Sequence, residues 1–294
     1  MHPFLRAIGF DTEKSSEREI ELLLDNLFHT YDHRTAAKEE NGTRAFVELS
    51  KSFGPNIGIC VCGELDGYGF HRTFYYPYMN GSGDTSKEEV SVDVRTNGDG
   101  YVGMLEEGRV GISLIFYAIN PGEIRKESFR SVLRSGLTTT TLSALALSGT
   151  ILLPIRSTKP KEQEDSKAYY QRHERLVTAA KNGNQEAIES LTMEDMDTYA
   201  MINRRIQTED VYSIVESCFM PYGMESDQYQ ILGTIQFYTR VRNTLTKEYL
   251  YQLTVECNGL VFDVCINQKD LLGEPEVGRR FKGNIWLQGR LRFE

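Results

Sequence analysis

The sequence lacks any apolar run long enough to cross a bilayer. Its most apolar window, Leu142 to Ile155, is short and is interrupted by serine, glycine and threonine, whereas a membrane-spanning helix needs roughly 18 or more apolar residues. The opening MHPFLRAIGF has neither the longer apolar region nor the small-residue cleavage site of a secretory signal. We therefore expect a cytoplasmic protein with no membrane contact.

Cysteine is scarce as well. The five cysteines are an odd number, and each lies in or beside an apolar segment. In a reducing compartment such residues are usually small buried hydrophobes, so we expect no disulfide framework. Cys60 and Cys62 would place both sulfurs on one face of a strand, but their spacing is not the C-x-x-C of redox and zinc sites. This pair therefore favours core packing.

Basic residues are outnumbered, with 33 Lys and Arg against 42 Asp and Glu, which gives a formal net charge of -9. The molecule as a whole therefore repels nucleic acid and anionic membranes, and only a local basic patch could reverse this.

Complete catalytic and cofactor motifs are also missing. The glycine-containing turns at 80–84 and 97–100 have neither the GK[ST] ending of a P-loop nor the ligand spacing of an EF-hand. No serine stands in a G-x-S-x-G elbow. We therefore predict no cofactor and assign no catalytic residue.

The 294 residues that are present, 40% of them hydrophobic, are enough for two or three compact units. Ile20, Leu24 and Leu27 belong to an apolar stripe with helical spacing, which Ser15 or Ser16 can cap, and we expect this helix to pack on a sheet. Short runs rich in Val, Ile, Phe and Tyr then predict an antiparallel sheet with strands at 44–50, 57–65, 69–78, 90–95 and 109–119.

The second half predicts a helical connector and a further group of strands. A short helix at 122–135 and a strand at 142–155 precede a polar stretch at 156–167, which is a candidate boundary. Helices flank the Asn182-Gly183 turn, and Thr208 begins another. Strands follow at 229–241, 249–257, 260–267 and 282–293, with a tight hairpin at Asn258-Gly259.

These patterns predict an α+β fold in three units. Residues 1–160 form an α+β domain with an N-terminal antiparallel sheet and packing helices, residues 161–224 form the helical connector, and residues 225–294 form a small antiparallel β-barrel that is OB-like. An open sheet packed on the helices is the alternative for the last unit.

Two sets of residues are candidates for binding. His29 and His33 are four apart and on a continuing helix would face the same way, a spacing that can bind a transition metal. The most basic stretch lies near the C-terminal end and interleaves basic and aromatic side chains, as single-stranded nucleic-acid binding requires. Its candidate partner-binding residues are Arg279, Arg280, Phe281, Lys282, Trp286 and Arg290.

Several long strings in the chain carry a family resemblance: the opening MHPFLRAIGF, the central GRVGISLIFY and LALSGTILLPI, and the closing GEPEVGRRFKGNIWLQGRL. They are similar to an uncharacterised family of cytoplasmic proteins from clostridial Gram-positive bacteria, known only as a domain of unknown function. The resemblance covers nearly the whole chain. It supports the cytoplasmic location, and it implies no activity, ligand or catalytic residue.

The leading hypothesis is a non-enzymatic cytoplasmic binding or regulatory protein that acts through a macromolecular partner, by binding another protein or by self-association. One alternative is a hydrolase-type enzyme whose site is assembled from distant residues, for example carboxylates with His71 or with the His29 and His33 pair. Another is single-stranded nucleic-acid binding by the C-terminal unit.

Overall fold

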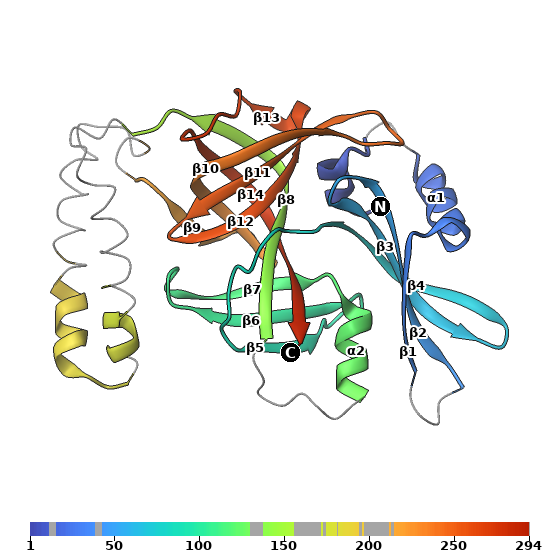
Figure 1. Ribbon diagram of the computed structural model, residues 1–294, viewed down its shortest axis with the longest axis horizontal. Helices are drawn as coiled ribbons and strands as arrows, with labels where there is room; N and C mark the ends of the chain where they lie inside the picture. The colour runs from blue at the N-terminus through green and yellow to red at the C-terminus, as the bar shows by residue number, and fades with distance from the viewer. Residues whose placement is uncertain are drawn as a thin grey trace.

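Strands dominate the fold, and they form one antiparallel sheet (sheet A) and one large mixed sheet (sheet B) (Figure 1). The computed structural model describes residues 1–11, 16–38, 43–129, 138–155, 172, 175–180, 182–193, 196, 212 and 215–293.

Sheet A joins four strands in chain order. They are β1 (His33–Lys38), β2 (Ala45–Gly54), β3 (Ile57–Asp66) and β4 (Gly69–Met79), and every pairing is antiparallel. The last three confirm the predicted strands. The first was missed because its sequence, HRTAAK, has a single buried residue, Ala37, and so lacks the apolar alternation that indicates a strand.

Helices cover both faces of sheet A. Helix α1 (Glu17–Thr30) confirms the predicted helix: Ser16 closes a capping box with Glu19, and Ile20, Leu24 and Leu27 are buried. Helix α2 (Pro121–Phe129) lies on the opposite side of the sheet from α1 (Figure 1). A short 3-10 helix, η1 (Pro3–Ile8), packs against both β4 and the strands of sheet B.

Sheet B contains ten strands drawn from both halves of the chain. They are β5 (Val90–Val94), β6 (Tyr101–Glu107), β7 (Ile112–Ala118), β8 (Thr138–Leu152), β9 (Cys218–Pro221), β10 (Gln228–Arg242), β11 (Tyr249–Cys257), β12 (Leu260–Asn267), β13 (Leu271–Leu272) and β14 (Arg280–Phe293). The short helix η2 (Gln268–Asp270) separates β12 from β13.

The C-terminal strands pair with a strand from the first half of the chain. Strand β8 pairs in parallel with β12 and antiparallel with β14, and β12, β11, β10 and β14 are joined by antiparallel pairings. The five strands therefore pair in a closed cycle. The antiparallel pairing predicted within residues 225–294 is present between β10, β11, β12 and β14, but the predicted unit lacked β8, which makes the sheet mixed through its parallel pairing with β12.

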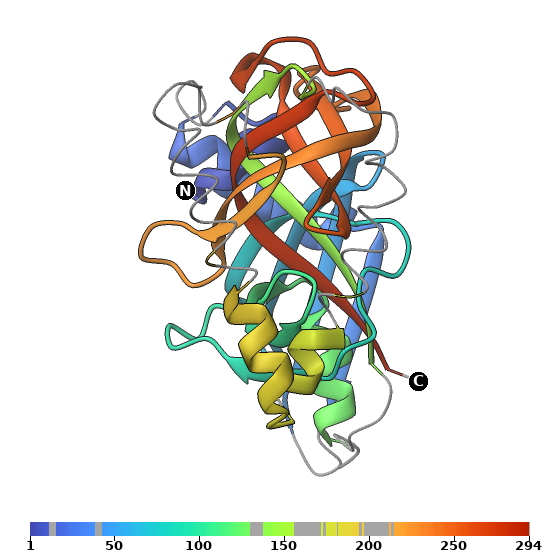
Figure 2. The same ribbon diagram turned by 90° about the vertical axis from the view of Figure 1, so that its left-hand side faces the viewer.

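The predicted N-terminal sheet was wrong in its extent. The strands expected at 90–95 and 109–119 appear as β5 and β7, but they pair through β6 within sheet B and not with sheet A. Strand β7 joins β14 at Gln288 and Gly289. The two long strands β8 and β14 run from the C-terminal strands down to β5–β7 in both views (Figures 1 and 2).

The helical connector is described only in part. Residues 175–180 and 185–193 are helical on either side of a turn at Asn182 and Gly183, which confirms the predicted hairpin. The polar stretch at 156–167 and most of the helix expected from Thr208 through Cys218 lie outside the described residues. The end of that helix was predicted wrongly, because Val215 is not helical and Cys218 begins β9. None of the described helices is long and apolar enough to cross a membrane.

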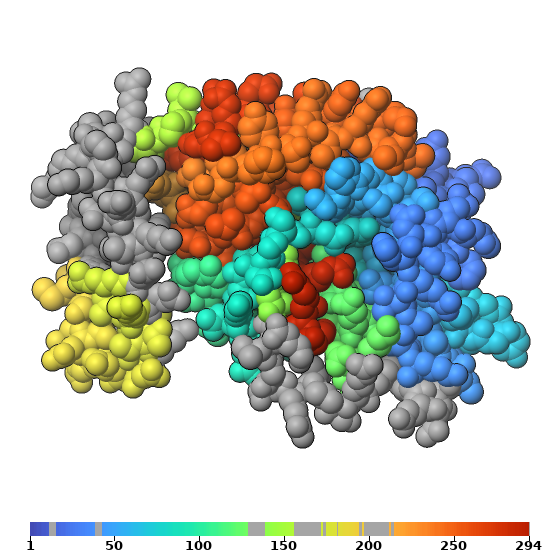
Figure 3. Space-filling model, viewed as in Figure 1, coloured from blue at the N-terminus to red at the C-terminus, as the bar shows by residue number. Residues whose placement is uncertain are grey.

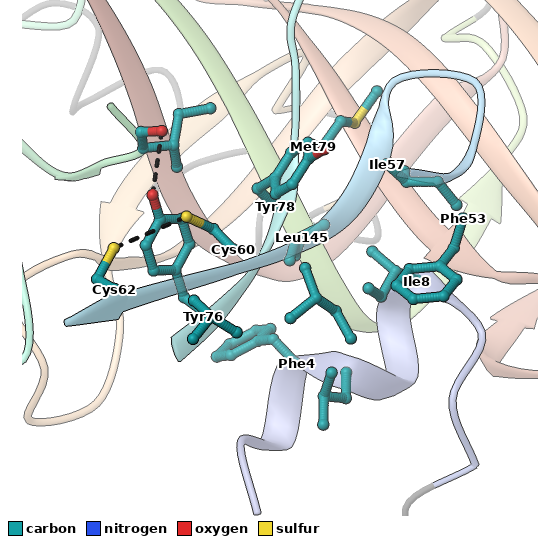
Figure 4. Packing of buried hydrophobic residues seen from close by; sticks show 14 of the residues in the cluster. Phe4, Ile8, Phe53, Ile57, Cys60, Cys62, Tyr76, Tyr78, Met79 and Leu145 are labelled. Carbon is teal, nitrogen blue, oxygen red and sulfur yellow. Dashed lines mark hydrogen bonds between the residues drawn. The ribbon is translucent and has the colours of Figure 1, made fainter. Parts of the chain in front are cut away.

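Two clusters of buried side chains hold the fold together. One lies between η1, α1 and sheet A and includes Trp286, and the other fills the space enclosed by the strands of sheet B. Figure 4 shows the first cluster, with Phe4 and Ile8 of η1 packed against residues of β2, β3 and β4. Cys60 and Cys62 lie within it, which confirms their predicted place in the core.

Candidate functional site

A polar cleft of about 350 Å³ lies where sheet A meets α2 and β14. Seven separate stretches of the chain contribute to it, including all four strands of sheet A. Its walls are formed by His33, Arg34, Thr35, Glu48, Ser50, Cys60, Tyr78, Asn80, Ile119, Glu123 and Arg290.

The pairing register of sheet A fixes which side chains enter the cleft. Thr35, Glu48 and Cys62 lie directly opposite one another on β1, β2 and β3, and residues paired in this way project from the same face of a sheet. That face meets α2, because the backbone N–H of Gly122 in the first turn of α2 donates to Oε2 of Glu48 at 2.7 Å. The register therefore turns the Glu48 carboxyl inward.

Glu48 is the only carboxylate among the buried residues of sheet A in the part of the chain that the structure describes. Burial raises its pKa from 4.5 to about 7, because the charged form loses its hydration, and this outweighs the stabilising bond from Gly122. The carboxyl therefore exchanges its proton near neutral pH, although 9% of the residue's surface remains exposed.

The inner wall of the cleft is formed by Cys60 and Tyr78, both buried. Burial raises the pKa of the Cys60 thiol and raises the pKa of Tyr78 to about 12. Both groups are therefore neutral at pH 7. The Sγ atoms of Cys60 and Cys62 are 3.8 Å apart (Figure 4). A neutral, buried thiol is a poor nucleophile.

The rim carries cationic groups. Arg290 donates to Oδ1 of Asn80 at 3.2 Å, and its guanidinium lies 3.8 Å from Glu123. Arg34 also borders the cleft, but it pairs with Leu49, so its side chain projects from the face of sheet A opposite to Glu48. On the face shown in Figure 3, the end of β14 is visible in a hollow beside α2. Since Glu48 is largely neutral below pH 7, Arg290 faces a single ionised carboxylate, that of Glu123, and Glu48 does not repel an anion there.

The predicted partner-binding aromatics are buried. Phe281 is 0% exposed because it packs in the cluster of sheet B, and Trp286 is 4% exposed because His2 and Phe4 pack against it. The ring of Phe281 fills the space beside Gly149 and Gly283, where an added Cβ would lie within 2.5 Å of it. Neither ring can therefore stack on a macromolecular partner in this conformation.

The predicted basic residues are dispersed. Arg280 is buried and donates to the backbone carbonyls of Leu153, Tyr212 and Val215. The other three are partly exposed: Arg279 pairs with Glu276 at 2.7 Å, Lys282 contacts the Tyr212 hydroxyl, and Arg290 lies on the rim of the cleft. Only Arg290 joins the candidate site.

The predicted metal pair is not on one helix. Helix α1 ends at Thr30, so exposed His29 stands in its last turn while His33 begins β1. The two imidazoles therefore do not share one face of a helix, as the i, i+4 spacing would require. In the described part of the chain, no group of three or more His, Cys, Asp or Glu side chains could hold a metal ion. His33 nevertheless lines the cleft.

Sequence reasoning missed Glu48, Cys60 and Tyr78 as site residues, since they come from three different strands. One signal was present: Glu48 is a lone carboxylate within the apolar run AFVELS, at a position that the strand pattern predicts to be half-buried. The partners of Glu48 could not be found in this way, because Gly122 is 74 residues distant.

Comparison with known proteins identifies a family and no function. A family model with the description "Domain of unknown function, E. rectale Gene description (DUF3881)" matches residues 5–289, which confirms the predicted resemblance. No curated protein and no solved structure matches the chain.

Proposed function

The chain belongs to the DUF3881 family, and we propose that it is a non-enzymatic binding protein that holds a small polar anion in the cleft at Glu48. The observation that carries this proposal is a buried carboxyl of raised pKa that faces a polar cleft together with the guanidinium of Arg290. The cleft volume, about 350 Å³, is near the lower end of the range for small-molecule sites.

Protonation of Glu48 is the proposed companion of binding. An anion close to an ionised carboxylate is repelled, so its entry favours the protonated form of Glu48 and raises its pKa further. The protonated carboxyl can donate a hydrogen bond to the anion. Affinity should therefore increase as the pH falls through about 7, the pKa of Glu48, provided that the ligand itself stays ionised.

Calorimetric titration with succinate and with inorganic phosphate tests the proposal. Succinate is useful because both of its carboxylates are ionised near pH 7.5, so a proton taken up from the buffer on binding must be bound by the protein. We expect binding that weakens roughly tenfold in Arg290→Gln, since a hydrogen bond to a charged group contributes about 1.5–3 kcal/mol. Succinate binding should also be accompanied by proton uptake.

Arg292→Gln is the matched control, because Arg292 lies two residues further along β14 and outside the cleft. Equal binding by wild type, Arg290→Gln and Arg292→Gln would refute the assignment of the cleft. Recovery of the unchanged ligand is expected for a binding protein. Conversion of the ligand would favour the alternative of a hydrolase-type enzyme with Glu48 as acid or base.

A second candidate function is contact with a macromolecular partner through the exposed face of β10 and β11. Here the Arg240 guanidinium lies 3.9 Å from the centroid of the Tyr249 ring and that of Arg242 lies 5.4 Å from it, and Tyr249 is 42% exposed. Neither arginine forms an ion pair with a carboxylate of the described residues. An exposed ring beside two guanidinium groups that no carboxylate in the described part of the chain neutralises favours single-stranded nucleic acid over an acidic protein.

A labelled oligonucleotide titrated at several salt concentrations tests this second function. Affinity should fall as salt rises and should be lost in Arg240→Glu plus Arg242→Glu, because phosphate contacts release counterions. The control is Arg279→Glu, because Arg279 is already paired with Glu276. An affinity for the oligonucleotide that does not change with salt, or that is retained in the double variant, would refute this second function.

Two further expectations from the sequence remain proposals. The cyclic pairing of β8, β12, β11, β10 and β14 supports an OB-like barrel, although one of its strands comes from outside residues 225–294. The cytoplasmic location and the division of the chain near residues 160 and 224 stay predictions.

A further inference from the structure

A second cavity, of about 240 Å³, lies on a different part of the molecule and is walled by aromatic rings. It is formed where the residues before η1 meet β4, β7 and β14. The centroid of the Trp286 ring lies 4.9 Å from that of His2, 5.1 Å from that of Phe4 and 5.0 Å from that of Tyr117. Tyr75 completes the aromatic wall.

The His2 imidazole has a buried nitrogen with no partner. Its Nδ1 atom is shielded from solvent and forms no hydrogen bond with any described residue. Burial, with the nearby Arg95 guanidinium as the second cause, lowers the pKa of His2 to about 4, so the ring is neutral at pH 7. A neutral imidazole can accept a hydrogen bond at one nitrogen, and leaving such an atom unpaired costs about 1–3 kcal/mol.

Carboxylates exceed cations around this cavity. Asp99, Glu225 and Asp227 line it, against the guanidinium of Arg95 and the N-terminal ammonium of Met1, which also acts on His2. Arg95 is already held by Asp227, which is 2% exposed, and by Asp99 at 3.1 Å. The Oδ1 atom of Asp99 still accepts no hydrogen bond, because Arg95 Nε lies out of line with it. Two acceptor atoms, His2 Nδ1 and Asp99 Oδ1, therefore remain without a hydrogen bond from the described residues, and the three carboxylates still outnumber the cations.

We propose that this cavity binds a small organic ammonium ion, such as a short alkyl diamine. An ammonium group supplies the N–H donors that His2 Nδ1 and Asp99 Oδ1 lack, and its charge offsets the excess of carboxylates. Aromatic rings attract cations through their negative quadrupoles, and the Arg95 guanidinium already lies 5.5 Å from the centroid of the Tyr117 ring at this site. A water molecule would satisfy the imidazole but would leave the excess negative charge in place.

The single tryptophan of the chain reports on binding directly. Trp286 is the only tryptophan and lies in the cavity wall, so its emission should change on occupation. We expect putrescine to cause a saturable change in Trp286 fluorescence of the full-length protein. The uncharged analogue 1,4-butanediol, of the same length, should cause none, because it lacks both the charge and the ammonium donors.

Asp99→Asn plus Glu225→Gln should weaken putrescine binding roughly tenfold or more, because hydrogen bonds to charged groups are lost. The control is Asp93→Asn, an exposed acid on β5 outside the cavity, which should bind as wild type does. His2→Phe keeps a ring against Trp286 and removes the acceptor, so it should also weaken binding.

Three results would overturn the proposal: no saturable change with putrescine, an equal change with butanediol, or equal weakening in Asp93→Asn and the double variant. If circular dichroism shows that the double variant does not fold, the test rests on His2→Phe. Putrescine binding by His2→Phe equal to that of the wild type would then refute the proposed site.

Discussion

Replacing Glu48 by Gln should remove a pH dependence of stability that the buried carboxyl creates. In the unfolded chain this group titrates near 4.5, and in the folded protein it titrates near 7. Between these values the folded protein holds one more proton than the unfolded chain, so the free energy of unfolding falls as the pH rises. The contribution is present in full below pH 4.5 and is lost as the pH rises through about 7.

The size of the effect follows from the two pKa values. Each unit of difference corresponds to about 1.4 kcal/mol, so the stability of the wild type should fall by roughly 3 kcal/mol across this window through Glu48 alone. Gln cannot ionise, and its side-chain oxygen can still accept the N–H of Gly122. The variant should therefore be close to the wild type at low pH and more stable than the wild type by up to about 3 kcal/mol above pH 8.

Urea denaturation of both proteins at a series of pH values measures this difference. Other titrating groups are common to the two proteins, so they cancel when one free energy is subtracted from the other. A difference that does not change between pH 5 and pH 8 would refute the reasoning, because it would mean that Glu48 ionises in the folded protein as it does in the unfolded chain.

Other predictions concern the buried residues of β3, β8 and β14. Phe281→Ala should lower the free energy of unfolding by about 3–5 kcal/mol. Gly149→Ala should also destabilise, because the added Cβ would lie 2.4 Å from the Phe281 ring, and a smaller residue at 281 should relieve that cost. Arg280→Met should cost roughly 2–4 kcal/mol, since it leaves buried carbonyls unpaired. Urea denaturation measures all three. Cys60 and Cys62, whose thiol pKa values burial raises, should react with a disulfide reagent only after unfolding.

Local features of the fold followed from the sequence because local residues determine them. The apolar stripe and Ser16 predicted α1, and the Asn-Gly pair at 258 and 259 predicted the hairpin of β11 and β12, where both residues have positive φ. The partner of each strand did not follow. The sequence of β8 predicts an apolar strand but not the sheet to which it belongs. Nothing in its residues indicates that β12 and β14 are its neighbours.

The site was harder to predict than the fold for the same reason. Trp286 reads as an exposed aromatic beside basic residues, yet it is buried because His2 and Phe4, more than 280 positions earlier, pack against it. Arg290 was chosen for its charge and does line the cleft, but the carboxyl it faces across the cleft comes from β2. Which side chains are buried, and which remote segments come close together, depends on the pairing of the strands. The composition of a strand does not reveal its partner.

The most direct test of the central claim is a ¹³C NMR titration of the glutamate side-chain carboxyl carbons, with Glu48 assigned through Glu48→Gln. We predict that one carboxyl titrates near pH 7 and that saturating succinate moves its pKa upward, because an anion in the cleft favours the protonated form. A Glu48 carboxyl that titrates near 4.5, or one whose pKa is the same with and without succinate, would contradict the account.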